Sequence, residues 1–261
     1  MHSLVKLGSA FAPPLIVLCV VLVCWESATI LFKTPMYLLP GPRTVLEAAL
    51  VFRGQLFSAT MLTAGAAACG FLLSLAVGTL IGFVFAQSRM IRLSCYPYAV
   101  FLQTVPMIAV APLIVIWCGY GFQSVVAVSF VISLFPVLAN ATTGLLSVEP
   151  ELIEMFRLFE ATRWQVLIKL RLPNAVPYLI AGAKTSAGLA VIGAIVGEFF
   201  AGYGTERFGL GYLVLQAKDQ LKTPELFAAV IAATLLGVLV FMLVSGVGGF
   251  ILQRWYGDQT L

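Results

Sequence analysis

The stretch EPELIEMFRLFEATRWQVLIKLRLP, residues 149–173, decides how this chain is organised. Apolar side chains recur in it at three- and four-residue spacing, which predicts two short amphipathic helices. The first apolar face holds Leu152, Met155, Phe156 and Phe159, and the second holds Trp164, Leu167, Ile168 and Leu172. We expect the two helices to join near Glu160, with Pro150 at the start of the first and Pro173 at the end of the second.

Long apolar runs flank this hairpin on both sides. The chain is 61% hydrophobic and 10% charged, whereas a soluble domain carries about 25% charged residues. Six runs are each long enough to cross a bilayer as a helix, namely residues 11–32, 58–86, 96–118, 124–146, 176–201 and 226–252. We therefore predict an all-α polytopic membrane protein with about six transmembrane helices. It forms a single transmembrane domain, residues 1–261.

Prolines and glycines predict the local shape of these runs and of the loops between them. Pro106 and Pro112 interrupt the third run, which we expect to be kinked or broken. Glycines 65, 70, 78 and 82 mark a face of the second run that favours close helix packing. Residues 33–57 read as a turn cluster followed by a short helix, and residues 202–225 as a glycine-rich polar loop. The first run lacks a following cleavage site and reads as a retained span.

The basic residues of the loops predict the orientation in the membrane. A cytoplasmic N-terminus puts eight of them inside and six outside, the direction that the positive-inside rule favours. The inside set is Lys6, Arg89, Arg92, Arg157, Arg163, Lys169, Arg171 and Arg254, and the outside set is Lys33, Arg43, Arg53, Arg207, Lys218 and Lys222. Both termini are then expected to be cytoplasmic. The net charge of +4 follows from these loops and does not indicate nucleic-acid binding.

The sequence offers no residues for catalysis or metal binding. His2 is the only histidine, and neither HExxH nor a serine with a partner base is present. The five cysteines lie in or beside apolar runs, and we interpret them as packing residues. We therefore predict that the chain is not an enzyme and carries no metal. The hairpin itself has two interpretations: it lies on the membrane surface, or it docks a soluble partner through its aromatic and charged residues.

The hairpin resembles the signature loop of permease subunits of bacterial ATP-binding-cassette importers. That pattern is Glu-Ala-Ala, three residues, Gly, nine residues, then Ile-x-Leu-Pro. Counting back from Pro173 places its Glu at Glu154, its Gly at Glu160 and its Ile at Leu170. Met155 and Phe156 stand where Ala-Ala is usual, and a glutamate replaces the turn glycine. A left-handed turn at Glu160 would cost roughly 1 kcal/mol or more, so the turn is either strained or built differently.

Other segments resemble the same family. They are residues 38–42 (LLPGP), 103–106 (QTVP), 111–113 (APL), 196–199 (VGEF) and 209–212 (GLGY). The branch they resemble comprises nitrate, sulfonate, taurine and bicarbonate permeases, together with permeases for vitamin precursors such as thiamine pyrimidines and riboflavin. Residues 223–227 (TPELF) are similar to the vitamin-precursor members.

The resemblance implies a type I importer permease fold with a cytoplasmic coupling loop at residues 149–173. Two copies would form the pathway in the bacterial cytoplasmic membrane, each would bind a cytoplasmic ATPase subunit, and an extracytoplasmic solute-binding protein would deliver the substrate. ATP and magnesium would be bound by the ATPase, because this chain has no GxxxxGK[ST] loop. The implied docking residues are Glu151, Glu154, Met155, Phe156, Phe159, Glu160, Ala161, Trp164, Leu170, Leu172 and Pro173.

Polar residues inside apolar runs are candidates for the pathway. They are Gln103, Thr104, Asn140, Thr143 and Glu198. A carboxylate in lipid is costly, so Glu198 either lines the pathway or gate, or bonds to a neighbouring helix. Lys184 either snorkels to the headgroups or faces the bundle. The alternative function is an ATP-independent transporter or channel, for which Glu26 and Glu198 would be the candidate coupling residues.

Overall fold

A computed structural model describes residues 2–202 and 208–256, with side chains for residues 13–202 and 208–255. Every regular element in those ranges is a helix. Five helices are long and apolar enough to cross a membrane. They are α1 (His2–Leu31), α3 (Arg53–Gln87), α6 (Phe122–Leu146), α9 (Leu172–Ala201) and α11 (Thr223–Tyr256). The prediction of an all-helical membrane protein is confirmed.

A bent helix pair supplies a sixth crossing when it is counted as one span. Helices α4 (Arg89–Thr104) and α5 (Met107–Cys118) meet at an angle of 101°. The bend falls at Val105, whose ψ of 124° is extended, because proline disfavours the helical region for the residue before it. The expected break is therefore at Pro106, whereas Pro112 lies inside α5 without interrupting it.

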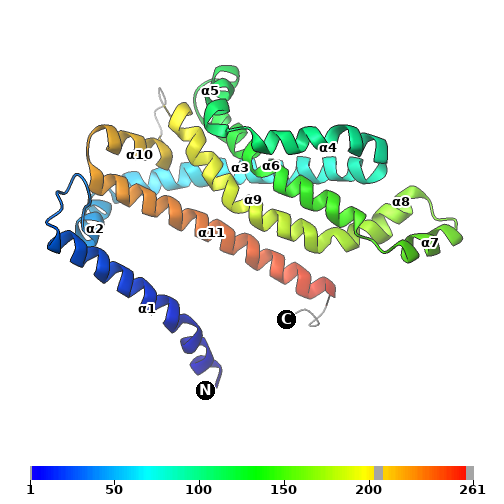
Figure 1. Ribbon diagram of the computed structural model, residues 1–261, viewed down its shortest axis with the longest axis horizontal. Helices are drawn as coiled ribbons and strands as arrows, with labels where there is room; N and C mark the ends of the chain where they lie inside the picture. The colour runs from blue at the N-terminus through cyan, green and yellow to red at the C-terminus, as the bar shows by residue number, and fades with distance from the viewer. Residues whose placement is uncertain (1, 203–207, 257–261) are drawn as a thin grey trace.

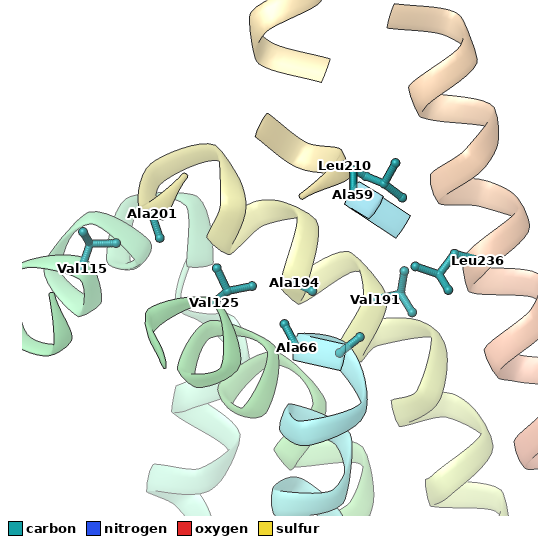
Figure 2. Packing of buried hydrophobic residues seen from close by; sticks show 10 residues of the cluster. Ala59, Ala66, Val115, Val125, Val191, Ala194, Ala201, Leu210 and Leu236 are labelled. Carbon is teal, nitrogen blue, oxygen red and sulfur yellow. The ribbon is translucent and has the colours of Figure 1, made fainter. Parts of the chain in front are cut away.

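Helices α3, α6 and α9 form the centre of the bundle (Figure 1). Figure 2 shows the main buried cluster at one end of it, where side chains of α3, α6 and α9 meet those of α5, α10 and α11. Small residues let the helices approach closely around Ser129 of α6. A Cβ at Gly70 of α3 would overlap the Ser129 side chain, and one at Gly193 of α9 would lie 2.7 Å from its Cα. Close packing of the second run is thereby confirmed.

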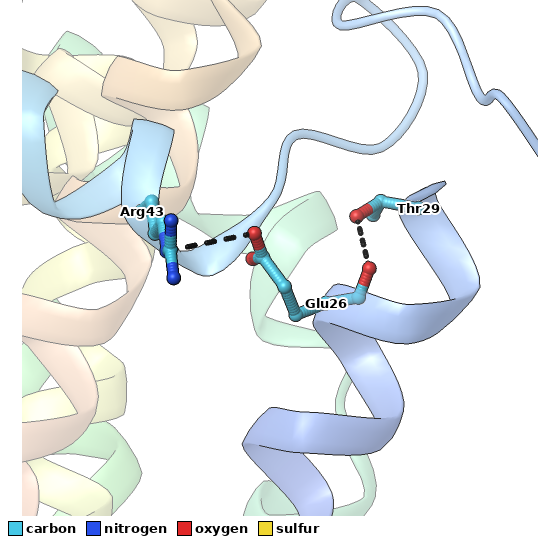
Figure 3. Close-up of polar contacts among 3 residues, drawn as sticks. All are labelled: Glu26, Thr29 and Arg43. Carbon is cyan, nitrogen blue, oxygen red and sulfur yellow. Dashed lines mark hydrogen bonds and ion pairs between the residues drawn. The ribbon is translucent and has the colours of Figure 1, made fainter. Parts of the chain in front are cut away.

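Helix α1 lies to one side of this bundle and contacts α2 (Pro42–Val51) and the start of α11 (Figure 1). Gly41 is the N-cap of α2 and Pro42 occupies its first turn, as the turn cluster predicted. Glu26 of α1 faces this turn, with its Oε1 3.8 Å from Nε of Arg43 (Figure 3). The Thr29 hydroxyl donates to the Glu26 backbone oxygen at 2.8 Å (Figure 3). Glu26 therefore helps to join α1 to α2.

The segment expected to be a polar loop contains a helix, α10 (Leu210–Asp219). Leu210 and Ala217 are buried on one of its faces. Helix α10 packs against α9, α11 and α3. It lies with α2 at one end of the bundle, and the hairpin of residues 149–173 projects from the other end (Figure 1). The prediction of a loop was wrong because ten residues carry too short an apolar pattern to stand out among glycines.

Candidate functional site

The hairpin consists of α7 (Pro150–Leu158) and α8 (Arg163–Val166), as the spacing of its apolar residues predicted. Glu160, at the turn between them, has a φ of 51°. Its N–H donates to the Arg157 oxygen at 2.9 Å, and the Ala161 N–H donates to the Phe156 oxygen at 3.0 Å. These two bonds are those of a Schellman motif, in which the left-handed position is usually glycine. The turn is therefore the usual one, with a strained residue in it.

A capping box starts the second arm of the hairpin. The Gln165 N–H donates to the Thr162 hydroxyl at 3.3 Å, and the Thr162 N–H donates to the Gln165 side-chain oxygen at 2.7 Å. Each side chain thus satisfies a backbone donor that the first turn of α8 leaves free. The capping box and the Schellman motif together fix the path of the chain between the two arms.

Pro173 does not end the second helix, contrary to our expectation. One π-helical turn (Leu167–Arg171) follows α8 and runs directly into α9, with the Leu172 N–H donating to the Leu167 oxygen. A proline inside an α-helix clashes with the carbonyl four residues earlier. The wider π turn places an extra residue at this point, and Pro173 then sits in the first turn of α9. The hairpin is consequently continuous with a membrane span from residue 163 to residue 201.

Three residues fix the base of the hairpin and the start of α9 to the bundle. Leu167 is buried against residues of α3, α6 and α9. The Arg171 guanidinium donates through Nη1 to the Ala86 oxygen at 2.6 Å, at the C-terminal end of α3 where cations are favoured. The Asn174 amide donates to the Gly144 oxygen at 3.2 Å and to the Ser147 hydroxyl at 2.9 Å, at the end of α6.

The outer part of the hairpin presents apolar side chains to solvent. Phe159 is 79% exposed and Trp164 is 69% exposed. The other expected docking residues divide in two: Glu151, Glu154, Met155 and Glu160 are exposed, whereas Phe156, Ala161, Leu170, Leu172 and Pro173 are half-buried. The last three belong to the helical path into α9. The exposed set therefore gathers on α7, the turn and the start of α8.

Glu198 lies at the opposite end of α9 and is only 3% exposed. Its Oε1 accepts a hydrogen bond from the Thr63 hydroxyl of α3 at 2.7 Å, and its Oε2 accepts from the Gly211 N–H of α10 at 2.7 Å. The Thr63 oxygen accepts in turn from the Leu210 N–H at 2.9 Å. Glu198 and Thr63 thus cap α10 from two other helices, satisfying amides that its first turn leaves free.

Glycines make room for this carboxylate. A Cβ at Gly209 would overlap the carboxylate of Glu198, and one at Gly211 would lie 2.9 Å from the Glu198 Cβ. Gly209 has a φ of −86°, which any residue can adopt, so only the close approach requires glycine there. Thr63 and the Leu210 amide were missing from our predicted site, because a threonine in an alanine-rich run carries no distinguishing signal.

The other pathway candidates lie apart from Glu198. Gln103 and Thr104 are exposed at the end of α4, beside the bend. Asn140 is half-buried on α6, and its amide donates to the Pro136 oxygen at 2.8 Å. Thr143 lines a cavity of about 340 Å³ between α4 and α6. Within one chain, these candidates do not converge on a single site.

The chain is thus a helical membrane bundle with a projecting hairpin at one end and a capped helix at the other. The fold is similar to that of a solved methionine ABC transporter in an inward-facing conformation, MetNI. The TM-score is 0.63 at 18% identity, and the match covers 78% of this chain and 97% of that one. Residues 74–256 match the model of the binding-protein-dependent transport system inner membrane components, and the chain belongs to this family.

Curated relatives extend the match over most of the chain. The riboflavin transport system permease protein RibX of Chloroflexus aurantiacus is 35% identical, over 92% of this chain and 88% of its own length. The formylaminopyrimidine transport permease protein ThiX of Halalkalibacterium halodurans is 31% identical, over 94% and 96%. The putative aliphatic sulfonates transport permease protein SsuC of Bacillus subtilis is 30% identical, over 84% and 79%.

Family membership decides between the two classes that the sequence left open. The chain is the permease subunit of an ATP-binding-cassette importer and a multi-pass protein of the inner membrane, rather than an ATP-independent channel. The ATPase activity of such an importer lies in a separate subunit, and the permease needs no cofactor of its own.

Proposed function

We propose that this chain pairs with a second copy to form the pathway of an importer for a heterocyclic vitamin or vitamin precursor, and that residues 149–173 dock its ATPase. The observation that carries the docking role is the exposure of Phe159 and Trp164 on a hairpin that projects from the bundle. Aromatic side chains on a short helix suit insertion into a groove of a soluble partner. Glu151 and Glu154 lie exposed beside them and suit the rim of such an interface.

Helix α9 connects the docking surface to the far side of the membrane. It spans 30 residues, or about 45 Å at 1.5 Å per residue. Because α8 and the π turn run into it without a break, a displacement of the hairpin moves α9 as one body. ATP binding to the ATPase subunits would then shift the permease between inward-facing and outward-facing populations.

Helix α10 is the element that this movement would displace on the opposite side. Glu198 and Thr63 attach it to α9 and α3 through hydrogen bonds of 2.7–2.9 Å. We assign α10 the role of a gate, and we assign Glu198 to holding this gate rather than to contacting the solute. A solute-binding protein would deliver its cargo on the α10 side, and both termini of the chain would lie on the hairpin side. The polar residues Gln103, Thr104, Asn140 and Thr143 are proposed to line the route between the two copies.

The substrate class rests on the relatives. Two of the three reported above are named for riboflavin and formylaminopyrimidine, both nitrogen heterocycles, and these are the two that match more than nine-tenths of this chain. The aliphatic sulfonates of the third relative are the second candidate.

Two measurements test the proposal. Copurification with the ATPase subunit, comparing wild type with Glu154→Arg at equal membrane insertion, tests docking, and we expect the variant to lose the ATPase. If the wild-type permease copurifies with no ATPase, the docking role is contradicted. Uptake of labelled riboflavin, formylaminopyrimidine and an alkanesulfonate, in a host lacking its own carriers and supplied with the matching ATPase and binding protein, tests the substrate. Uptake of the sulfonate alone contradicts the heterocycle assignment.

A further inference from the structure

A cavity of about 360 Å³ lies at the base of the hairpin, between the hairpin and the end of α3. Three arginines on three successive segments line it: Arg157 of α7, Arg163 of α8 and Arg171 of the π turn. The remaining lining residues are neutral, namely Ala86, Gln87, Ile153, Ala161 and Val166. The cavity thus concentrates positive charge without an acidic side chain in its wall.

The three arginines have no anionic partner among the residues that the structure describes. None of the ion pairs within residues 13–202 and 208–255 involves them. Arg171 is held in place by its bond to the Ala86 oxygen, yet its Nε is buried and has no acceptor. A buried donor without an acceptor is costly, and like charges at close range repel each other. Both observations point to an anion with several acceptor oxygens.

The position of the cavity indicates where this anion comes from. Ala86 and Gln87 are the last residues of α3, a helix long and apolar enough to cross a membrane, so the cavity lies at the end of a candidate span, on the side where headgroups are expected. The exposed apolar residues Phe159 and Trp164 are not part of its lining. The cavity is therefore distinct from the exposed aromatic surface at the outer part of the hairpin.

We propose that the cavity of Arg157, Arg163 and Arg171 binds the phosphate group of an anionic phospholipid headgroup. Guanidinium groups match phosphate oxygens in bidentate geometry. Basic pockets beside transmembrane helices are known binding places for such headgroups. The bound lipid stabilises the hairpin against α3 and joins the coupling hairpin to the membrane. This inference depends neither on the transported solute nor on the docking of an ATPase.

The test measures binding of labelled phosphatidylglycerol to the purified transporter, with all its copurifying subunits, in nanodiscs of phosphatidylcholine. Arg157→Gln with Arg163→Gln removes two cavity charges and leaves Arg171 at the end of α3. Lys169→Gln with Arg254→Gln is the matched control, because it removes two exposed charges that do not line the cavity. We expect the cavity variant to bind roughly tenfold more weakly and the control to change little.

A conservative pair, Arg157→Lys with Arg163→Lys, keeps both positive charges but loses the bidentate hydrogen-bonding geometry of the guanidinium groups. We expect this lysine pair to bind phosphatidylglycerol with an affinity between those of wild type and the glutamine pair. It replaces the glutamine pair in the test if that pair fails to insert into the membrane. Equal losses in cavity variant and control contradict a specific site. Full competition by millimolar inorganic phosphate shows that the ligand is free phosphate and overturns the lipid assignment. Lipid binding that occurs only after the other subunits are stripped away shows that the arginines face a protein, and this also overturns it.

Discussion

The hydroxyl of Thr63 donates to Oε1 of Glu198 at 2.7 Å while its oxygen accepts from the Leu210 N–H at 2.9 Å, so one threonine joins α3, α9 and α10. The same hydroxyl also lies 3.0 Å from the Ala59 oxygen of its own helix. Thr63 and Glu198 are 0% and 3% exposed, so both side chains are shielded from solvent. Two side chains from distant parts of the chain therefore hold the first turn of α10 to α3 and α9, in addition to the apolar packing of the helix.

Thr63→Val keeps the shape of the side chain and removes both its donor and its acceptor. The Leu210 N–H and Oε1 of Glu198 then lose their partner in the interior, at about 1–3 kcal/mol for each group. We expect a lower midpoint of thermal unfolding in detergent and faster hydrogen exchange in residues 208–219. The control is Thr60→Val, because Thr60 is half-buried on the same helix and bonds only to the Leu56 oxygen. Equal effects of the two substitutions would show that α10 is held by other contacts.

Gly209→Ala tests the space around the carboxylate rather than its hydrogen bonds. The backbone at Gly209 suits alanine, but the added Cβ would overlap the Glu198 carboxylate. Overpacking of this kind costs about 1–3 kcal/mol, and we expect loss of transport together with reduced thermal stability. Gly246→Ala is the control, since nothing lies within 4 Å of a Cβ there. A Gly209→Ala protein as stable and active as this control would falsify the close contact as a requirement.

The features predicted correctly from the sequence have local causes. The amphipathic arms of the hairpin follow from apolar spacing within nine residues, and the bend at Pro106 follows from the missing N–H and the restricted residue before it. Helix α10 and its capping residues could not be predicted in this way. Thr63 and Leu210 are separated by 147 positions, and their contact exists only when three helices are packed.

Pro173 shows a second kind of limit. Proline in the first turn of a helix and proline after the end of a helix look alike in a sequence. Here the π turn at Leu167–Arg171 decides between them, and that turn depends on the anchoring of Leu167 and Arg171 against α3 and α6. Because the hairpin and the span are continuous, a displacement of the hairpin moves α9 with it in the proposed mechanism.

Glu160→Gly tests the strain in the hairpin turn. Glu160 has a φ of 51°, a left-handed conformation that costs an L-residue about 1–2 kcal/mol. Glycine removes this strain, but it lowers the free energy of unfolding by about 0.5–1 kcal/mol because it loses more conformational entropy on folding. We therefore expect a small gain in the protease resistance of residues 149–173. Glu160→Ala separates strain from charge, because it removes the carboxylate and keeps the Cβ. Equal gains from glycine and alanine would assign the effect to charge.

Trp164→Ala tests whether the exposed aromatic face of the hairpin contacts the ATPase. Because Trp164 is 69% exposed, its truncation should leave the thermal stability of the isolated permease nearly unchanged. A central aromatic at a protein interface contributes about 2 kcal/mol or more, so we expect at least a tenfold loss of ATPase affinity in a pull-down titration. The control is Trp117→Ala, which removes an equally exposed tryptophan from α5, away from the hairpin. If both variants retain the ATPase while Glu154→Arg loses it, the contact runs through the charged side of α7 and the aromatic face serves another surface.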